Sequence, residues 1–329
     1  MKQLHDTIAE PAPGPLRVMF CITSMPVGGA ETLLVNLIDR MDRSRLAPEL
    51  CCLKQLGPLG EQLAGRIPTF NGLLSHKIDL RVWPRLVRLF RQRRIDAVVT
   101  VGAGDKMFWG RLAARQAGVP VVISALHSTG WPDSIGRLNR LLTPWTDAFV
   151  GVAQAHATHL SDIEGFPADR VHVIPNGVDV ERFSPSGDRR TVRAELGIAD
   201  AAPVVGIVAA LRPEKNHPLL LRAMRHLLQR DPPARLVLVG DGPQRKPLEQ
   251  MTADLGISHA VRFLGNRYDT HRLLPAFDCF ALSSRIEASP VSILEAMASR
   301  LPVVATRVGS VAESVIDGET GYLVESGAT

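Results

Sequence analysis

The sequence lacks the residue patterns that hold metals and redox centres. Its four cysteines (Cys21, Cys51, Cys52 and Cys279) form no C-x-x-C pair and stand at no Cys/His ligand spacing. The ten histidines form no H-E-x-x-H motif, and no D-x-D pair is present. These absences exclude a zinc ribbon and a thioredoxin-like dithiol. We expect buried, reduced thiols, no bound metal and no cofactor.

Long apolar runs are also missing. The longest, such as residues 203–211, have the length of a β-strand rather than of a membrane-spanning helix, and no apolar signal region follows Lys2. Residues 1–15 are rich in proline and polar residues, which predicts a loose tail. We therefore expect a cytoplasmic protein.

Aromatic residues are scarce, at 5% of the chain, whereas basic residues are in excess. Lys and Arg total 38 against 33 Asp and Glu, which gives a formal net charge of +5. A basic chain suits an anionic ligand, a membrane surface or nucleic acid. Nucleic acid is the least supported partner, because the basic residues are not interleaved with stacking aromatics and no recognition motif is present.

What the sequence does contain is an alternation of strand-like and helical patterns, repeated twice. Apolar runs lie at residues 17–22, 95–101, 119–126, 204–209, 236–239, 261–264, 279–281 and 303–305, with helical patterns between them. This alternation predicts parallel sheets with helices on both faces. A turn-prone stretch after Pro175-Asn176-Gly177 separates the two sets. We predict two doubly wound domains, residues 16–178 and 179–329, facing each other across a cleft.

One helix start near the C-terminus has the features of an anion site. Ser289 is a good N-cap and Pro290 suits the first helical position, so the N–H groups of Val291 and Ser292 are left without intrahelical partners. Helix starts of this kind bind anions.

Two carboxylates flank this helix start. Glu287 lies just before it in the loop, and Glu295 lies about two turns along it. One carboxylate can meet a sugar while the other accepts hydrogen bonds from the vicinal hydroxyls of a ribose. The simpler alternative is a capped surface helix with two solvated acids.

Two cations follow directly on a predicted strand. Arg212 and Lys215 come after the run at 204–209, so both project from the carboxyl end of that strand. A guanidinium offers forked hydrogen bonds to phosphate oxygens, and an ammonium offers a compact charge. The pair predicts a diphosphate site, and the alternative is an exposed basic turn in which Glu214 pairs locally.

Six segments, in order, resemble the retaining glycosyltransferases of the GT-B fold, specifically family 4 (glycosyl transferases group 1). Residues 287–295 resemble that family's E-x7-E motif, with Glu-Ala where relatives often have Glu-Gly. The other segments are Gly28-Gly29-Ala30-Glu31 (G-G-x-E), Pro175-Asn176-Gly177-Val178-Asp179 (P-N-G-V-D), Arg212-Pro213-Glu214-Lys215 (R-x-x-K), Gly240-Asp241-Gly242-Pro243 (G-D-G-P) and Val261-Arg262-Phe263-Leu264-Gly265 (the base-pocket strand).

The resemblance implies an α/β protein of the GT-B fold, with two Rossmann-like domains across a cleft. It implies a metal-independent retaining hexosyltransferase that moves a sugar from a nucleotide-sugar donor to a hydroxyl acceptor, which is lipid-linked or a polysaccharide precursor. The N-terminal domain would hold the acceptor, and the C-terminal domain the donor.

The same resemblance assigns roles to residues. Glu287 approaches the sugar, Glu295 anchors the ribose, and Arg212 and Lys215 stabilise the departing diphosphate. His127, just past the run at 119–126, serves the acceptor by hydrogen bonding or proton relay. The other candidates are Gly28, Gly29, Asp241, Gly242, Gly265, Ser289, Val291 and Ser292 at the donor, and Asp105 and Lys106 at the acceptor.

Two rival functions stay open. One is a nucleotide-sugar-binding module without turnover, and the other is a GT-B nucleotide-sugar epimerase. A dinucleotide-binding protein is less well supported, because G-x-G-x-x-G is absent and the second domain would be unexplained.

A basic amphipathic helix is predicted at residues 81–94. Arg81, Arg85 and Arg88 lie along one face, with apolar residues opposite. Such a helix either docks on an anionic membrane or covers a sheet while its arginines remain solvated.

The chain also ends soon after Tyr322-Leu323-Val324, a strand-like run. In the family that the sequence resembles, terminal helices usually follow such a strand. We therefore expect a donor domain that is truncated, with weakened activity.

Overall fold

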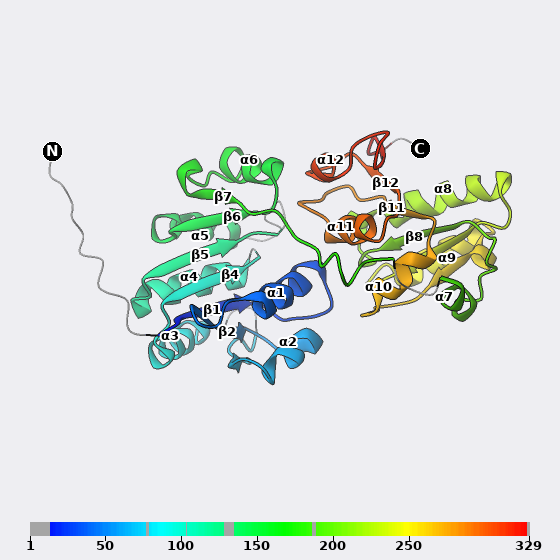
Figure 1. Ribbon diagram of the computed structural model, residues 1–329. Helices are drawn as coiled ribbons and strands as arrows, with labels where there is room; N and C mark the ends of the chain where they lie inside the picture. Colours follow the sequence, from blue (N-terminus) through cyan, green and yellow to red (C-terminus); the bar gives the residue numbers. More distant parts are fainter. Residues whose placement is uncertain (1–13, 77–78, 103, 128–134, 186–188, 328–329) are drawn as a thin grey trace.

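The structure is a computed structural model, and it describes residues 14–76, 79–102, 104–127, 135–185 and 189–327. Most of the predicted N-terminal tail lies outside these ranges. In the part of the chain that is described, two parallel sheets lie side by side, each covered by helices, and the chain passes between them after β7 (Figure 1).

The first domain holds a seven-stranded parallel sheet within the described residues. Its strands, in spatial order, are β3 (Thr69–Phe70), β2 (Leu46–Cys52), β1 (Leu16–Ile22), β4 (Ala97–Val101), β5 (Val121–Ala125), β6 (Ala148–Gly151) and β7 (Val171–Val173). Its helices are α1 (Gly29–Arg40), α2 (Gly57–Ala64), α3 (Val82–Arg93), α4 (Asp105–Ala117), α5 (Ile135–Leu141) and α6 (Gln154–Asp162).

The alternation of side chains along β1 explains the two layers of helices around this sheet. Val18, Phe20 and Ile22 pack with residues of α1 and α2, whereas Met19 and Cys21 pack with residues of α3 and α4. Successive residues of a strand point to opposite faces, so an uninterrupted apolar run is buried on both sides. The central strand therefore needs helices on each face of the sheet.

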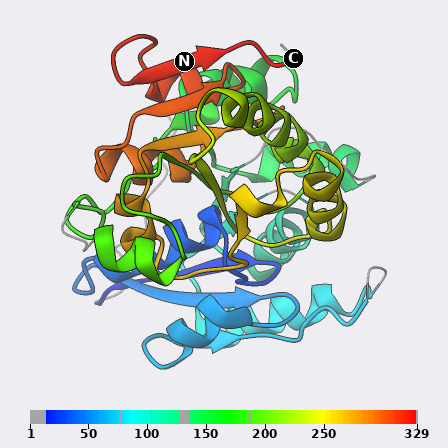
Figure 2. The same cartoon turned by 90° about the vertical axis from the view of Figure 1, so that its right-hand side faces the viewer.

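The second domain repeats this plan with a six-stranded parallel sheet in the described residues. Its strands, in spatial order, are β10 (Val261–Phe263), β9 (Arg235–Val239), β8 (Val204–Val208), β11 (Cys279–Leu282), β12 (Val303–Thr306) and β13 (Gly321–Val324). Its helices are α7 (Arg189–Glu195), α8 (His217–Arg230), α9 (Arg245–Asp254), α10 (Thr270–Leu273), α11 (Val291–Ala298) and α12 (Val311–Ser314). Figure 2, in which this domain faces the viewer, shows β13 at one edge of the sheet.

Both sheets reverse their strand order at one point, between β1 and β4 and between β8 and β11. Open α/β sheets bind ligands at such switch points, beyond the carboxyl ends of the strands. The prediction of two doubly wound α/β domains is confirmed, and the predicted apolar runs coincide with strands whose ends shift by a residue or two.

The basic amphipathic helix is α3, and its apolar face belongs to the core. Val82, Leu86 and Phe90 are buried among the strands and α4. Arg81, just before the helix, and Arg85 both donate to the buried Asp79. Arg91 donates to the Gln116 carbonyl, and Arg93 donates to Glu49. Within the described residues, every helix is too short or too polar to span a lipid bilayer.

Candidate active site

The helix α11 lies on the side of the second domain that faces the first (Figure 1). The sequence predicts Ser289 as the N-cap, and the structure corrects this. Pro290 takes the N-cap position with extended backbone (φ −73°, ψ 110°), and no side chain of the described residues caps the helix. Ile293 donates its N–H to the Pro290 carbonyl. The N–H groups of Val291 and Ser292 therefore have no intrahelical acceptor.

Three contacts hold the loop before α11 in place. Asn176 Nδ2 donates to the Ser289 carbonyl at 2.8 Å, and Ser310 Oγ donates to the Ala288 carbonyl. A Cβ on Gly309, whose φ is +53°, would lie 1.7 Å from the Glu287 carbonyl oxygen. Only glycine permits this approach. The loop is thus fixed by the chain linking the domains and by the segment after β12.

The carboxylate of Glu287 is paired with Lys215. Glu287 Oε1 accepts from Lys215 Nζ at 2.5 Å and from Ser284 Oγ at 2.6 Å. The side chain of Glu287 is 8% exposed and that of Lys215 is 22% exposed. Such a pair is sensitive to the loss of either partner, because a lone buried charge is costly. The two predicted residues are therefore brought together, although they lie 72 positions apart.

Arg212 behaves differently from Lys215. Its side chain is 62% exposed, and its Nη1 lies 4.0 Å from Glu214 Oε1. The local pairing with Glu214 that the sequence left open therefore involves Arg212 and not Lys215, which pairs with Glu287. The strand end before it is packed tightly, since a Cβ on Gly242 would lie 2.5 Å from the Leu211 carbonyl oxygen. Arg212 is thus an exposed guanidinium with a long ion pair to Glu214, on a tightly packed loop three residues before Lys215.

The two predicted nucleotide loops touch each other. Gly240 N–H donates to the Gly265 carbonyl at 2.8 Å. Asp241 accepts from the Gly242 N–H at 2.7 Å and pairs with Arg245 at 3.1 Å. Arg245 also lies over the ring of Phe263. The loops after β9 and β10 therefore pack against each other, and Arg245 contacts both segments. The sequence motifs did not single out this arginine.

Glu295 has an unusual ionisation. Burial raises the pKa of Glu295 to about 7, and the positive charge of Arg182 opposes this rise. A half-buried carboxyl whose pKa lies near neutrality is a candidate functional group.

The glycine loop of the first domain lies against α11. A Cβ on Gly29 would lie 3.6 Å from Val291 Cγ2, and a Cβ on Gly28 would clash with the Glu31 carboxylate. Burial raises the pKa of Glu31, whereas Lys106 of the same domain and Arg212 of the other domain lower it. Positive charges from both domains therefore act on one carboxylate, that of Glu31.

The acceptor-side candidates gather next to this loop. Lys106 extends over Gly102, where a Cβ would lie 3.3 Å from its Nζ. His127 follows β5, and burial together with His156 and Lys106 lowers the pKa of His127 to about 4. The imidazole is therefore neutral at neutral pH. Asp105 is the first residue of α4, and its side chain lies outside what the structure describes.

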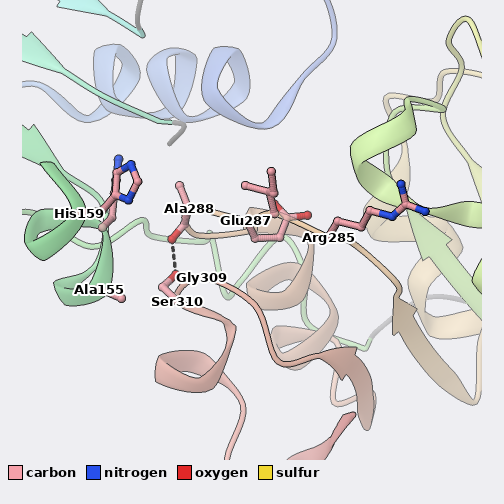
Figure 3. A pocket seen from close by; sticks show the side chains of 9 residues that line it. Ala155, His159, Arg285, Glu287, Ala288, Gly309 and Ser310 are labelled. Carbon is pink, nitrogen blue, oxygen red and sulfur yellow. Dashed lines mark hydrogen bonds between the residues drawn. The ribbon is translucent and has the colours of Figure 1, made fainter. Parts of the chain in front are cut away.

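A pocket of about 230 Å³ lies between the two domains. Figure 3 shows His159 and Ala155 of α6 on one side, and Glu287, Ala288, Gly309 and Ser310 of the second domain on the other. The side chain of Arg285 turns away from His159. Among the described residues, no three His, Cys, Asp or Glu side chains cluster as metal ligands would.

Ser284 and Ser310 are not among the site residues predicted from the sequence. Both are buried, and both hold the Glu287 loop through their hydroxyl groups. Their only sequence signal is position: Ser284 follows β11, and Ser310 follows β12, at the carboxyl ends of parallel strands.

Comparison with known proteins agrees with this geometry. Residues 27–182 match the family model described as Glycosyltransferase Family 4, and residues 188–329 match the one described as Glycosyl transferases group 1. The chain is 30% identical to the putative glycosyltransferase EpsF of Bacillus subtilis (strain 168) over 301 residues, which are 88% of this chain and 78% of that protein.

Two further similarities are informative. The UDP-Gal:alpha-D-GlcNAc-diphosphoundecaprenol alpha-1,3-galactosyltransferase of Escherichia coli is 27% identical over 319 residues, 92% of this chain and 82% of that one. The crystal structure of Anabaena Alr3699/HepE in complex with UDP-glucose superposes with a TM-score of 0.82 and 27% identity, covering 95% of this chain and 86% of that one. The matches to both halves and the shared two-domain fold show that this chain belongs to the GT-B glycosyltransferases.

Proposed function

We propose that this protein transfers a hexosyl group from a nucleotide-sugar donor to a hydroxyl acceptor, without a metal and with retention of anomeric configuration. The observation that carries the proposal is the convergence of Lys215, Glu287 and the open start of α11 opposite Gly29 of the first domain. The UDP-glucose bound to HepE and the UDP-galactose in the name of the Escherichia coli relative favour a uridine donor.

The charge at the site suits a departing diphosphate. Lys215, Arg212 and the N–H groups at the start of α11 are positive or partly positive donors. Donors held in place before the reaction stabilise charge that develops in the transition state. We propose that the carboxylate of Glu287, held by Lys215 and Ser284, accepts a hydrogen bond from a hydroxyl of the donor sugar, and that Glu295 accepts hydrogen bonds from the ribose diol.

We propose a same-face displacement. The acceptor oxygen forms a bond to the anomeric carbon as the bond to the diphosphate breaks, and the electron pair of that bond goes to the diphosphate. The acceptor proton then passes to an oxygen of the leaving phosphate. His127, neutral because its pKa is lowered to about 4, accepts or donates a hydrogen bond to the acceptor.

Product analysis tests this function. The purified chain is incubated with UDP-, GDP- and ADP-hexoses and with a lipid-diphosphate sugar acceptor, in buffer with and without EDTA. We expect a glycosylated acceptor and free nucleoside diphosphate, unaffected by EDTA. Epimerised donor with no transfer would indicate an epimerase, and a thermal shift with no turnover would indicate a binding module; either result contradicts the proposal.

We further propose that α3 brings the protein to an anionic membrane that carries the acceptor. The outer face of α3 exposes Arg88 and Arg91, and Leu80 and Trp83 are exposed at its start. Basic residues attract anionic lipid, and tryptophan favours the interfacial region. The apolar face is occupied by the core, so the contact is electrostatic and peripheral rather than inserted.

Charge reversal on α3 should weaken vesicle binding. Arg88→Glu with Arg91→Glu should lower co-sedimentation with phosphatidylglycerol vesicles about tenfold or more at low salt, since each basic residue contributes about 1 kcal/mol near such a surface. The matched control is Arg222→Glu with Arg225→Glu, two exposed arginines of α8 in the other domain. Equal sedimentation of both variants and the parent would contradict the proposal. The helix α3 would then only cover the sheet, with its arginines in water.

A further inference from the structure

The helix α6 begins without a cap of its own. Its N-cap residue is Ala153, whose backbone is extended (φ −164°, ψ 163°) as an N-cap requires, but whose methyl side chain accepts no hydrogen bond. The first N–H groups of a helix need an external acceptor. For α6 that acceptor comes from the other domain.

The acceptor is the carboxylate of Glu313. Its Oε2 accepts from the Gln154 N–H at 2.9 Å, and its Oε1 accepts from the Ala155 N–H at 2.7 Å. The partners lie 158 and 159 positions apart in the chain. Figure 1 shows α6 and α12 facing each other where the two domains approach. A carboxylate also complements the positive end of the helix dipole, so the contact is favoured by both geometry and charge.

Glu313 is tied to the loop that carries Glu287. Its N–H donates to the Ser310 carbonyl at 2.9 Å, and Ser310 Oγ donates in turn to the Ala288 carbonyl. The preceding Gly309 packs on the Glu287 carbonyl. One short segment therefore contacts the sugar-side loop of the second domain and the helix α6 of the first domain, and the pocket of Figure 3 lies between them.

We propose that Glu313 is a positioning residue for transfer, which holds the acceptor domain in register with the donor domain by capping α6 across the cleft. The inference rests on the proposed transfer reaction, because an acceptor on the first domain must meet a donor sugar beside Glu287. The placement follows from two hydrogen bonds to one carboxylate, and a carboxamide at this position supplies only one acceptor oxygen.

Glu313→Gln tests the contact, with Glu319→Gln, another exposed glutamate of the second domain, as the matched control. We expect kcat/KM for the acceptor to fall about three- to tenfold, the range for a carboxylate at a partly exposed helix start. The donor Kd should stay within twofold, since the donor residues lie elsewhere. The control should match the parent, and a variant with unchanged kcat/KM would overturn the inference.

A second variant distinguishes two roles of Glu313, the capping of α6 and the positioning of one domain against the other. Ala153→Ser supplies α6 with its own acceptor. In the Glu313→Ala background, we expect this change to raise the melting temperature but not to restore kcat/KM. If Ala153→Ser restores turnover, Glu313 only caps a helix and the inference is wrong.

A measurement that needs no turnover keeps this proposal separate from the proposed function. Spin labels at Arg88→Cys of α3 and Arg222→Cys of α8 report the distance between the domains. We expect Glu313→Gln to broaden that distance distribution, whether or not transfer is observed with the chosen donor. An identical distribution in parent and variant would contradict the role of Glu313, even in an active enzyme.

Discussion

Lys215→Ala should lower kcat about 10²- to 10³-fold, the loss seen when one preorganised donor to a developing oxyanion is removed, while the donor Kd changes far less. The side chain of Lys215 is 22% exposed, so water screens its charge only in part. Charge on the diphosphate grows as the glycosidic bond breaks, so Lys215 contributes more to the transition state than to the bound donor. Steady-state kinetics and calorimetry with the intact donor measure the two effects separately.

The ion pair with Glu287 offers an alternative cause for the same loss. Without Lys215, the carboxylate of Glu287 retains Ser284 as its partner in the described contacts and is left buried with an uncompensated charge. Glu287→Gln added to Lys215→Ala removes that charge. We expect kcat to stay low in the double variant. Recovery toward the parent would mean that Lys215 only neutralises Glu287, and Arg225→Ala on the exposed face of α8 controls for loss of a cation.

Glu295→Gln should weaken donor binding by about 1.5–3 kcal/mol, which corresponds to roughly 10- to 150-fold, because a neutral amide accepts less strongly than a carboxylate from a ribose diol. The pKa of Glu295 is raised to about 7, so its carboxyl is protonated below this pH and ionised above it. Donor affinity of the parent should therefore rise about tenfold between pH 6 and pH 8, since only the ionised form is the strong acceptor.

The Glu295→Gln variant tests whether Glu295 is the cause of this pH dependence. Affinity of Glu295→Gln should be nearly flat over this range, whereas Glu319→Gln should follow the parent. The pKa values of His127 and His217 are lowered to about 4, so neither group changes charge between pH 6 and pH 8. A parent enzyme with flat affinity, or a variant that keeps the slope, would remove Glu295 from the ribose site.

The raised pKa also sets the sign of a stability effect. The folded protein holds the Glu295 proton more tightly than the unfolded chain does, so this group favours folding below its ordinary pKa, and that advantage is lost as the pH rises through about 7. A bound donor, by hydrogen bonding to the ionised form, should reverse this trend. The donor-induced thermal shift should accordingly grow with pH.

Apolar runs are what reveals strands in this sequence. The run at β1 is apolar from Val18 to Ile22 and was predicted, whereas β2 contains Pro48 and Glu49 and was not among the predicted runs. Glu49 is buried because Arg17 and Arg93 pair with it, a long-range contact that leaves no local signal. Periodicity detects burial by apolar neighbours but not burial by ion pairing.

The residues of the candidate site could be predicted from the sequence, but the long-range contacts that hold them could not. Lys215 was predicted because it follows a strand, and topology brings the carboxyl ends of parallel strands to one edge. Glu287 was predicted because it lies just before a helix start, in a segment that resembles a family motif. The contacts that hold them were not predicted: Ser310 and Glu313 act through backbone groups of segments distant in the chain. The cap of α11 was predicted wrongly by one residue, because Pro290 keeps an extended backbone instead of opening the helix.

The anomeric configuration of the product tests the central claim most directly. Proton NMR of the glycosylated acceptor gives the coupling constant of the new anomeric proton, which is compared with that of the donor. Same-face displacement within a site that holds the diphosphate at Lys215 and α11 predicts the configuration of the donor in the first product formed. An inverted product would contradict the account, because the acceptor would then have attacked from the side opposite the diphosphate.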